Sequence, residues 1–126
     1  IEVEQRDGKV FVTVGSGGAF PSGTADLTAE AQRIMDRIAL TAMSPDSSIT
    51  VTGHTDDVPI SNGQFRDNWD LGAGRAASVV QAIQNTGLIS GDRLSAVSKG
   101  EMAPLADNNT AAGREQNRRI EIEISY

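Results

Sequence analysis

The sequence predicts an α+β fold, a two-layer sandwich in which two main helices cover one face of a mixed β-sheet. Apolar and polar residues alternate in the manner of strands at both ends of the chain, over 1–14 and 119–125. Two stretches with an amphipathic, helical spacing of apolar residues lie between them, at about 28–42 and 68–86. A short strand-like run follows each of these stretches, so helices and strands interleave along the chain.

The first third of the chain predicts a β-hairpin and a helix. Asp7-Gly8 is a two-residue turn signal between the alternating runs of 1–14. The glycine-rich run 15–18 predicts a flexible break. The helix at about 28–42 begins with Thr28, a good capping residue, and a short strand is expected from Ser48 to Gly53.

The rest of the chain predicts a long connection, a second main helix, and then two strands with a loop and a short helix between them. Such a long strand-to-helix connection, here 57–67, is usually functional or disordered. Asn68 is the expected cap of the second helix, and Gly87 suits its C-terminal end. The remaining elements are a strand, a loop, a short helix and a strand, over 93–98, 100–109, 110–117 and 119–125.

Arg75 interrupts the apolar face of the second helix, because it falls between Leu71 and Val79 on the same side. A guanidinium keeps its charge, so a buried one needs an anionic partner, either a protein carboxylate or a ligand. Asp56 follows a predicted strand and supplies a carboxylate for a shared site that suits a small zwitterion. The alternative is a structural salt bridge from Arg75 to Asp56 or Asp70.

Two glycines weaken the same helix near Arg75. Gly72 and Gly74 each cost the helix roughly 1 kcal/mol relative to alanine. We therefore expect another segment to pack very close to the helix at this point.

The composition limits the partners. The 126 residues carry a net charge of −6 and no cysteine. Acidity argues against nucleic acid or an anionic membrane surface as the main partner, and the lack of cysteine excludes disulfides. No membrane span, signal peptide or initiator methionine is visible, so an excised fragment or mature product is expected. Residues 1–126 are expected to form one domain, with 1–18 as a hairpin and glycine-rich connection.

An ordered set of residues is shared with a known family. The set comprises Thr55-Asp56, Asn68-x-x-Leu71-x-x-x-Arg75-Ala76 and Gly113-Arg114-x-x-Asn117-Arg118-Arg119-Ile120-Glu121-Ile122. From about Phe20 to the C-terminus, the chain resembles the OmpA-like peptidoglycan-binding domain. The runs 19–25 and 53–60 resemble, within that family, the flagellar motor stator B subunit (MotB/PomB type). The resemblance implies a β/α/β/α/β/β order plus a short C-terminal helix.

The resemblance also implies a function. It is non-catalytic binding of the diaminopimelate in the peptidoglycan stem peptide, which anchors the stator to the cell wall during motility and chemotaxis. Asp56 would bind the ligand ammonium and Arg75 the neighbouring carboxylate. The implied peptidoglycan-binding residues are Asp56, Arg75, Thr55, Asn68, Leu71 and Arg118. No catalytic residue, metal or cofactor is implied.

The implied location is the periplasmic domain of an inner-membrane protein in a Gram-negative bacterium. The implied partners, besides peptidoglycan, are a second copy of the chain in a homodimer and the stator A subunit, which would be reached through a membrane segment outside this chain. Nucleic acid is not an implied partner.

Two other functions stay open. One is a generic OmpA-like outer-membrane or lipoprotein anchor. The other is a wall-remodelling hydrolase with Asp56 and Asp57 as its acid and base. Neighbours on an extended segment point in opposite directions, which disfavours the second.

Several polar and aromatic residues can be explained by a structural role alone. His54 is expected to be a hydrogen-bonded residue at a strand end, because no second histidine or cysteine supports a metal. Trp69 is expected to pack into the core at the helix start, with sugar stacking as the alternative. The C-terminal arginines could contact ligand, pair with Glu115 and Asp107, or lie in water; they are Arg114, Arg118 and Arg119.

Overall fold

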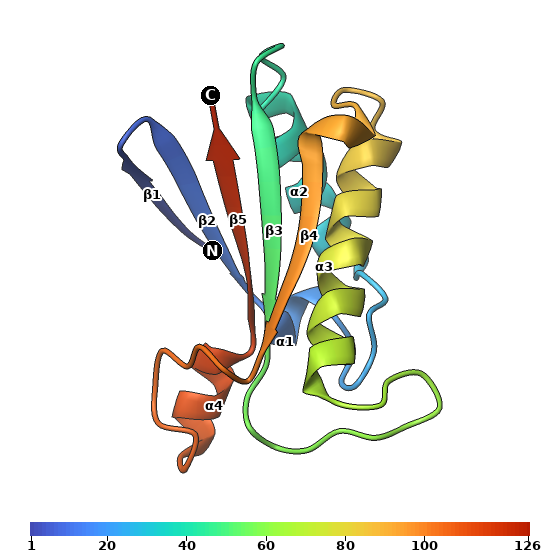
Figure 1. The fold of residues 1–126 in the computed structure, drawn as a ribbon, viewed down its shortest axis with the longest axis vertical. Helices are drawn as coiled ribbons and strands as arrows, with labels where there is room; N and C mark the ends of the chain where they lie inside the picture. Colours follow the sequence, from blue (N-terminus) through green and yellow to red (C-terminus); the bar gives the residue numbers. More distant parts are fainter.

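Five strands form one mixed sheet in the order β1-β2-β5-β3-β4 in the computed structural model, which describes residues 1–126 (Figure 1). Strands β3 and β4 are parallel, and every other neighbouring pair is antiparallel. The strands are β1 (Glu2–Arg6), β2 (Lys9–Gly15), β3 (Ser48–His54), β4 (Leu94–Gly100) and β5 (Arg119–Ser125). The predicted α+β fold with a mixed sheet is confirmed.

The two main helices pack on the same face of this sheet (Figure 1). The helices are α1 (Ser16–Ala19), α2 (Ala29–Thr41), α3 (Asn68–Asn85) and α4 (Ala111–Asn117), and a 3₁₀ turn, η1, covers Gly91–Arg93. None of them combines the length and apolar composition that crossing a membrane requires. Helix α4 and the long β3–α3 connection lie at the same end of the sheet (Figure 1).

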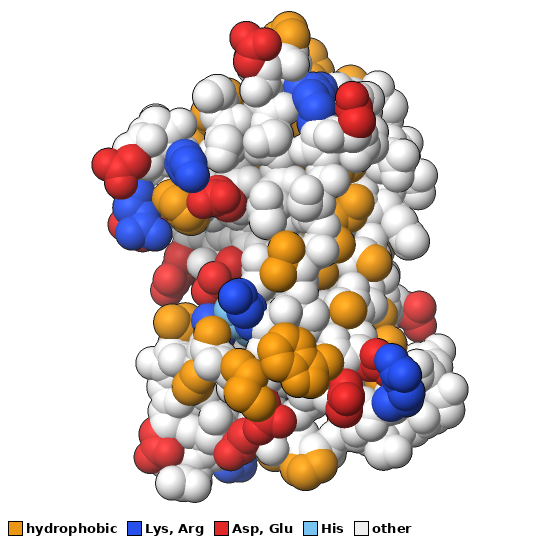
Figure 2. All heavy atoms as spheres, viewed as in Figure 1, with side chains coloured by type: hydrophobic (Ala, Val, Ile, Leu, Met, Phe, Trp, Pro, Cys, Tyr) orange, Lys and Arg blue, Asp and Glu red, His pale blue; other side chains and the backbone are white.

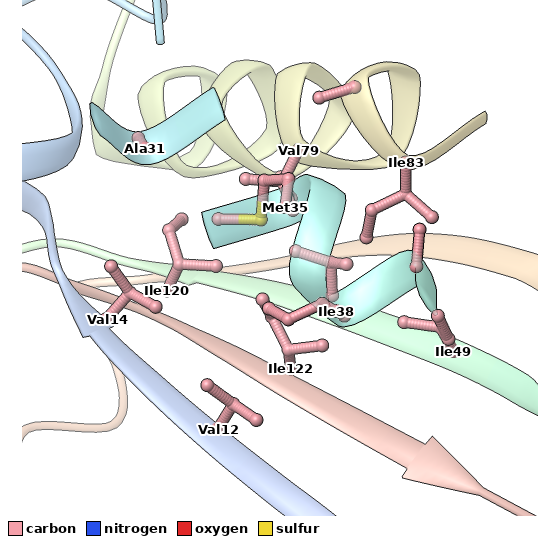
Figure 3. Packing of buried hydrophobic residues seen from close by; sticks show 14 of the residues in the cluster. Val12, Val14, Ala31, Met35, Ile38, Ile49, Val79, Ile83, Ile120 and Ile122 are labelled. Atoms are coloured by element: carbon pink, nitrogen blue, oxygen red, sulfur yellow. The ribbon is translucent and has the colours of Figure 1, made fainter. Parts of the chain in front are cut away.

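The core lies between the sheet and helices α2 and α3. In Figure 3, side chains from β2 and β5 point toward those of the two helices. Ile120, Ile122 and Ile124 of β5 are each 1% exposed, and their alternation with polar residues was visible in the sequence. Burial of one such side chain contributes about 1.5–3 kcal/mol, so β5 is a main source of stability.

The predicted N-terminal hairpin is present. Arg6 pairs with Lys9, and Asp7 and Gly8 between them have positive φ angles of 52° and 73°. A two-residue turn with positive φ at both positions matches the twist of the flanking strands. Strand β1 is exposed along its whole length, at the edge of the sheet.

Three sequence-based expectations are corrected by the structure. The glycine-rich run is not a flexible break, because residues 16–19 form α1 and Phe20 N–H donates to Ser16 O. The cap of α3 is Asp67, whose side chain accepts from Asp70 N–H, and not Asn68. The strand predicted over 93–98 is β4, which begins at Leu94 because η1 occupies the preceding residues, and which ends at Gly100.

Helix α3 comes unusually close to the sheet and to the long connection. A Cβ atom at Gly53 of β3 would collide with the backbone of Gly72, and one at Gly74 would lie 2.8 Å from the Phe65 ring. Both helical glycines therefore make room for a neighbouring segment, as expected. The β3–α3 contact fixes the start of α3 relative to the end of β3, where Asp56 follows.

Candidate ligand-binding cleft

An open cleft of about 520 Å³ lies where the ends of β3 and α3 meet α1 and α4. Seven of its 14 lining residues are polar or charged, and four are hydrophobic. The lining residues that bear on ligand chemistry are Ser16, Phe20, Asp56, Asn68, Leu71, Arg75, Arg114 and Arg118. Five of the six residues implied by the family resemblance thus line one cleft, and Thr55 does not.

Asp56 presents a nearly buried carboxylate to the cleft, with 8% of the residue exposed. Its Oδ1 accepts a hydrogen bond from Val58 N–H at 3.0 Å. Its Oδ2 accepts one from Arg118 Nη1 at 2.6 Å. Asp57 is exposed and does not line the cleft, so only one of the two adjacent carboxylates does.

Two polar side chains hold the Asp56 backbone in place. Asn68 Nδ2 donates to Asp56 O at 3.2 Å and to Val58 O at 3.1 Å. Thr55 Oγ1 donates to Asp56 O at 2.8 Å, and Thr55 N–H donates to Gly100 O. Asn68 therefore ties the connection to α3, and Thr55 ties it to β4. Thr55 itself is buried and does not line the cleft.

Arg75 is buried, with 4% exposed, and has no carboxylate partner. Its Nε donates to Thr24 O at 2.8 Å, its guanidinium carbon lies 4.9 Å from the Phe20 ring centroid, and neither Nη bonds to the protein. Burial lowers the pKa of Arg75, the charge of Arg118 lowers it further, and Asp56 opposes both. The cleft therefore contains a desolvated cation that its own carboxylate does not neutralise.

The alternative of a structural salt bridge for Arg75 is wrong for both candidate partners. Asp56 pairs with Arg118, as described above. Asp70 binds Arg66 through two side-chain hydrogen bonds of 2.7 and 2.9 Å, and Arg66 lowers the pKa of Asp70 to about 2. Neither candidate carboxylate therefore forms a salt bridge with Arg75.

The other C-terminal arginines have partners that the sequence did not indicate. Arg114 lines the cleft and donates from Nη1 to Asn108 O at 2.9 Å. Arg119 is 3% exposed and donates from Nε to Glu121 Oε2 at 2.7 Å. The considered pairs with Glu115 and Asp107 are absent, because these arginines turn toward loop carbonyls and β5.

Asn117 is a positioning residue that sequence reasoning missed. It is fully buried, and its Oδ1 accepts from Leu105 and Ala106 N–H at 2.7 and 2.9 Å. Its Nδ2 donates to Ala106 O and to Asn108 Oδ1. Asn117 thereby fixes the loop before α4 and the backbone that carries Arg118. Its place in the family motif was the only signal.

His54 is buried at the end of β3, and Glu121 is its polar neighbour. Its Nε2 lies 3.2 Å from Glu121 Oε1, and Nδ1 has no partner. Burial, then the charge of Arg119, lowers the pKa of His54, while Glu121 opposes both. No group of three or more histidine, aspartate or glutamate side chains could hold a metal.

Trp69 is 49% exposed, so the expectation of core packing is wrong. Its indole lies over Gly100, and it does not line the cleft. Hydrophobic side chains are scattered over the face of the molecule that carries β4 (Figure 2). Exposed apolar residues of this part of the chain include Trp69, Val97, Met102 and Leu105.

The sequence of this chain matches the OmpA family over residues 19–118. The chain belongs to the OmpA family. Motility protein B of Bacillus subtilis is 32% identical over 125 residues, which cover 98% of this chain and 48% of that protein. Peptidoglycan-binding protein ArfA of Mycobacterium tuberculosis is 33% identical over 108 residues, which cover 85% of this chain and 32% of ArfA. The OmpA-family chain thus spans half or less of these relatives.

Solved structures give the same fold. The cell wall anchor of the type VI secretion system (T6SS) from Pseudomonas aeruginosa has a TM-score of 0.91 at 32% identity, with 98% of this chain and 86% of that chain covered. The periplasmic domain of Helicobacter pylori MotB has a TM-score of 0.85 at 27% identity, with 99% and 88% covered. The similarity to these two structures therefore extends over almost the whole chain, beyond residues 19–118 that match the OmpA family.

Proposed function

We propose that this OmpA-family domain binds peptidoglycan without cleaving it and anchors a flagellar motor stator to the cell wall. The observation that carries the proposal is that a buried Arg75 without a carboxylate partner lines the same cleft as the Asp56 carboxylate. The ligand group that fits is the amino-acid head group of diaminopimelate in the stem peptide, which has an ammonium and a carboxylate on one carbon.

The chemistry of recognition follows from the free donors and acceptors. The ligand ammonium takes the place of Arg118 at Asp56 Oδ2. The ligand carboxylate accepts hydrogen bonds from the unpartnered Nη atoms of Arg75, and a guanidinium can bind a carboxylate through two parallel bonds. Leu71 and Phe20 supply apolar contact beside these charges. Asn68 and Thr55 hold Asp56 in position.

The named relatives support a wall-binding role in a motor. Motility protein B and the MotB periplasmic domain are similar over nearly the whole chain, and ArfA is named as peptidoglycan-binding. By analogy, the chain is a periplasmic domain of an inner-membrane protein of a Gram-negative bacterium. A homodimer and a stator A subunit, bound through a segment outside this chain, belong to the same proposal.

No step of this binding breaks a bond, and the exposed Asp57 does not line the cleft, so the domain is proposed not to be an enzyme. Co-sedimentation of the purified domain with peptidoglycan sacculi tests the function. We expect retention by sacculi that contain diaminopimelate, competition by free diaminopimelate, and no release of soluble muropeptides. Release of muropeptides, or equal retention by sacculi that contain lysine in its place, would contradict the proposal.

A second candidate differs in what is anchored. The similarity to the T6SS cell wall anchor, with its TM-score of 0.91, favours a wall anchor of another envelope assembly. A chimera separates the two: this domain replaces the corresponding part of motility protein B in a motility-deficient strain. Restored swimming supports the stator, whereas a stable, wall-bound chimera that does not restore swimming supports the other anchor.

A further inference from the structure

The cleft carries more positive charge than one amino-acid head group can neutralise. Its charged lining residues are Asp56, Arg75, Arg114 and Arg118, which together have a net charge of +2 in a protein of net charge −6. Under the proposed function, a head group brings one ammonium and one carboxylate. The ammonium occupies Asp56 and the carboxylate meets Arg75. Arg118 is then released, and two guanidiniums remain without an anion.

Arg114 and Arg118 both have donors to spare. Arg114 contacts only the neutral carbonyl of Asn108, through Nη1. Arg118 contacts Asp56 through Nη1 alone and is 38% exposed, so its remaining N–H groups are unused. Forked guanidiniums bind carboxylates best through two N–H groups at once. Both arginines are therefore able to accept a second anion in the cleft.

Ser16 supplies a separate observation at the same end of the cleft. The residue is 2% exposed and lines the cleft, yet its Oγ has no hydrogen-bond partner. Its backbone N–H donates to Arg118 O at 2.9 Å, so the serine is tied to the arginine. A buried hydroxyl without a partner is unfavourable, and such a group in a native structure calls for an explanation. Rotation about χ1 can turn the hydroxyl toward a bound acceptor.

We infer that Ser16, Arg114 and Arg118 form a second anion subsite in the cleft, which binds another carboxylate of the same stem peptide. This inference rests on the proposed function. The Asp56–Arg118 pair closes the subsite in the free domain. Arrival of the ligand ammonium at Asp56 releases Arg118, which then shares the second carboxylate with Ser16 and Arg114. The domain thereby recognises a peptide with two carboxylates, beyond an isolated zwitterion.

Calorimetric titration with the tripeptide alanyl-γ-glutamyl-diaminopimelate tests the subsite. We expect Ser16→Ala and Arg114→Gln each to weaken binding about tenfold, the loss of one hydrogen bond to a charged group. Arg33→Gln, at an exposed position of α2, is the matched control and is expected to bind like the unaltered domain. Unaltered affinity of both Ser16→Ala and Arg114→Gln would overturn the inference.

Two amidated forms of the tripeptide identify the second carboxylate. One carries an amide at the glutamyl α-carboxylate, and the other carries an amide at the carboxylate of diaminopimelate that is distant from its free ammonium. We expect one of the two amidated tripeptides to bind the unaltered domain as weakly as the unmodified tripeptide binds Ser16→Ala. For that amidated tripeptide, Ser16→Ala is expected to cause no further loss of affinity. If both substitutions still weaken binding of both amides, the assigned contact is wrong.

Thermal unfolding separates a binding role of Ser16 from a structural one. Because the hydroxyl has no partner in the free domain, Ser16→Ala is expected to leave the melting temperature unchanged or to raise it. A lower melting temperature would contradict the inference. The proposed function is tested separately by Asp56→Asn: loss of binding in that variant, with Ser16→Ala and Arg114→Gln unaffected, would overturn the subsite alone.

Discussion

Asp56 is paired with Arg118, 62 residues away in the sequence, and not with Arg75, although both arginines line the same cleft. The Asp56 side chain is 11% exposed and the Arg118 side chain 38%, so Arg118 can leave toward solvent while Asp56 stays in the cleft. Under the proposed function, a ligand ammonium replaces Arg118 as the partner of Asp56. In the free domain, Asp56 is thus bound by an arginine that a ligand can displace, while Arg75 in the same cleft has no carboxylate partner.

The close contact of Gly53 with Gly72 predicts a large loss of stability on Gly53→Ala. The added methyl group would collide with the backbone of α3, and overpacking of this kind costs about 1–3 kcal/mol or more. Urea unfolding measures the effect. Gly18→Ala is the control, because no atom lies within 4 Å of its Cβ position, and it is expected to be neutral or slightly stabilising. Equal effects of the two substitutions would show that α3 does not touch β3 here.

Removal of the Asn117 side chain is expected to destabilise the domain by about 3 kcal/mol, because two backbone N–H groups lose their buried acceptor. Thermal unfolding measures the loss. Asn117→Asp retains an acceptor for these groups but loses the two donor contacts, so an intermediate effect is expected. Ligand binding is expected to weaken in parallel, since Arg118 follows directly. A stable Asn117→Ala variant would show that the loop is held by other contacts.

The stability of the domain is expected to decrease as the pH falls below about 6.5. Burial and Arg119 lower the pKa of His54 from 6.5, so the unfolded chain takes up this proton at a higher pH than the folded domain does. The decrease continues until the pH reaches the folded-state pKa. Urea unfolding at several pH values measures it, and His54→Gln is expected to flatten the dependence.

Glu121 affects the stability of the domain in a lower pH range than His54 does. Burial alone raises its pKa, but Arg119 and His54 hold the pKa below 4.5. Its contribution to stability is present above the unfolded-state value of 4.5 and is lost only as the pH falls through the lower folded-state pKa. An unchanged slope between pH 7 and pH 5 in His54→Gln would therefore exclude His54 as its source.

Trp69→Ala is expected to leave the affinity for stem peptide unchanged, because Trp69 does not line the cleft. The measurement is the same calorimetric titration. Acrylamide is expected to quench the fluorescence of this single tryptophan readily, with or without ligand, since the residue is 49% exposed. Protection by bound peptide would instead place the ligand over the indole, as in the sugar-stacking alternative.

Local patterns predicted most of the fold. The alternation of Ile120, Ile122 and Ile124 gave the bounds of β5, and the Asp7-Gly8 turn gave the hairpin. Both features depend on side chains that are near one another in the sequence. Residues 16–19, in contrast, carried no helical signal in the sequence. They form α1 because Ser16 N–H donates to Arg118 O and Phe20 N–H donates to Ser16 O.

The candidate site was predicted in part. Arg75 stood out, since a charge within an apolar stripe is a local anomaly. Asp56 and Arg118 were also named, but their pairing was missed, as was the unpartnered Ser16 hydroxyl, because both depend on segments that only the folded sheet brings together. The exposure of Trp69 was missed for the same reason: helical position does not reveal that β4 ends at Gly100 beneath the indole.

The most direct test of the central claim is a calorimetric double-mutant cycle with the diaminopimelate tripeptide on Asp56→Asn, Arg75→Gln and the combined variant. We expect each single substitution to weaken binding about a hundredfold, because each removes the partner of one buried charge of the head group. The combined loss should be smaller than the product of the two, and unfolding curves should show that all variants are folded. Affinity equal to that of the unaltered domain in both folded single variants would contradict the account.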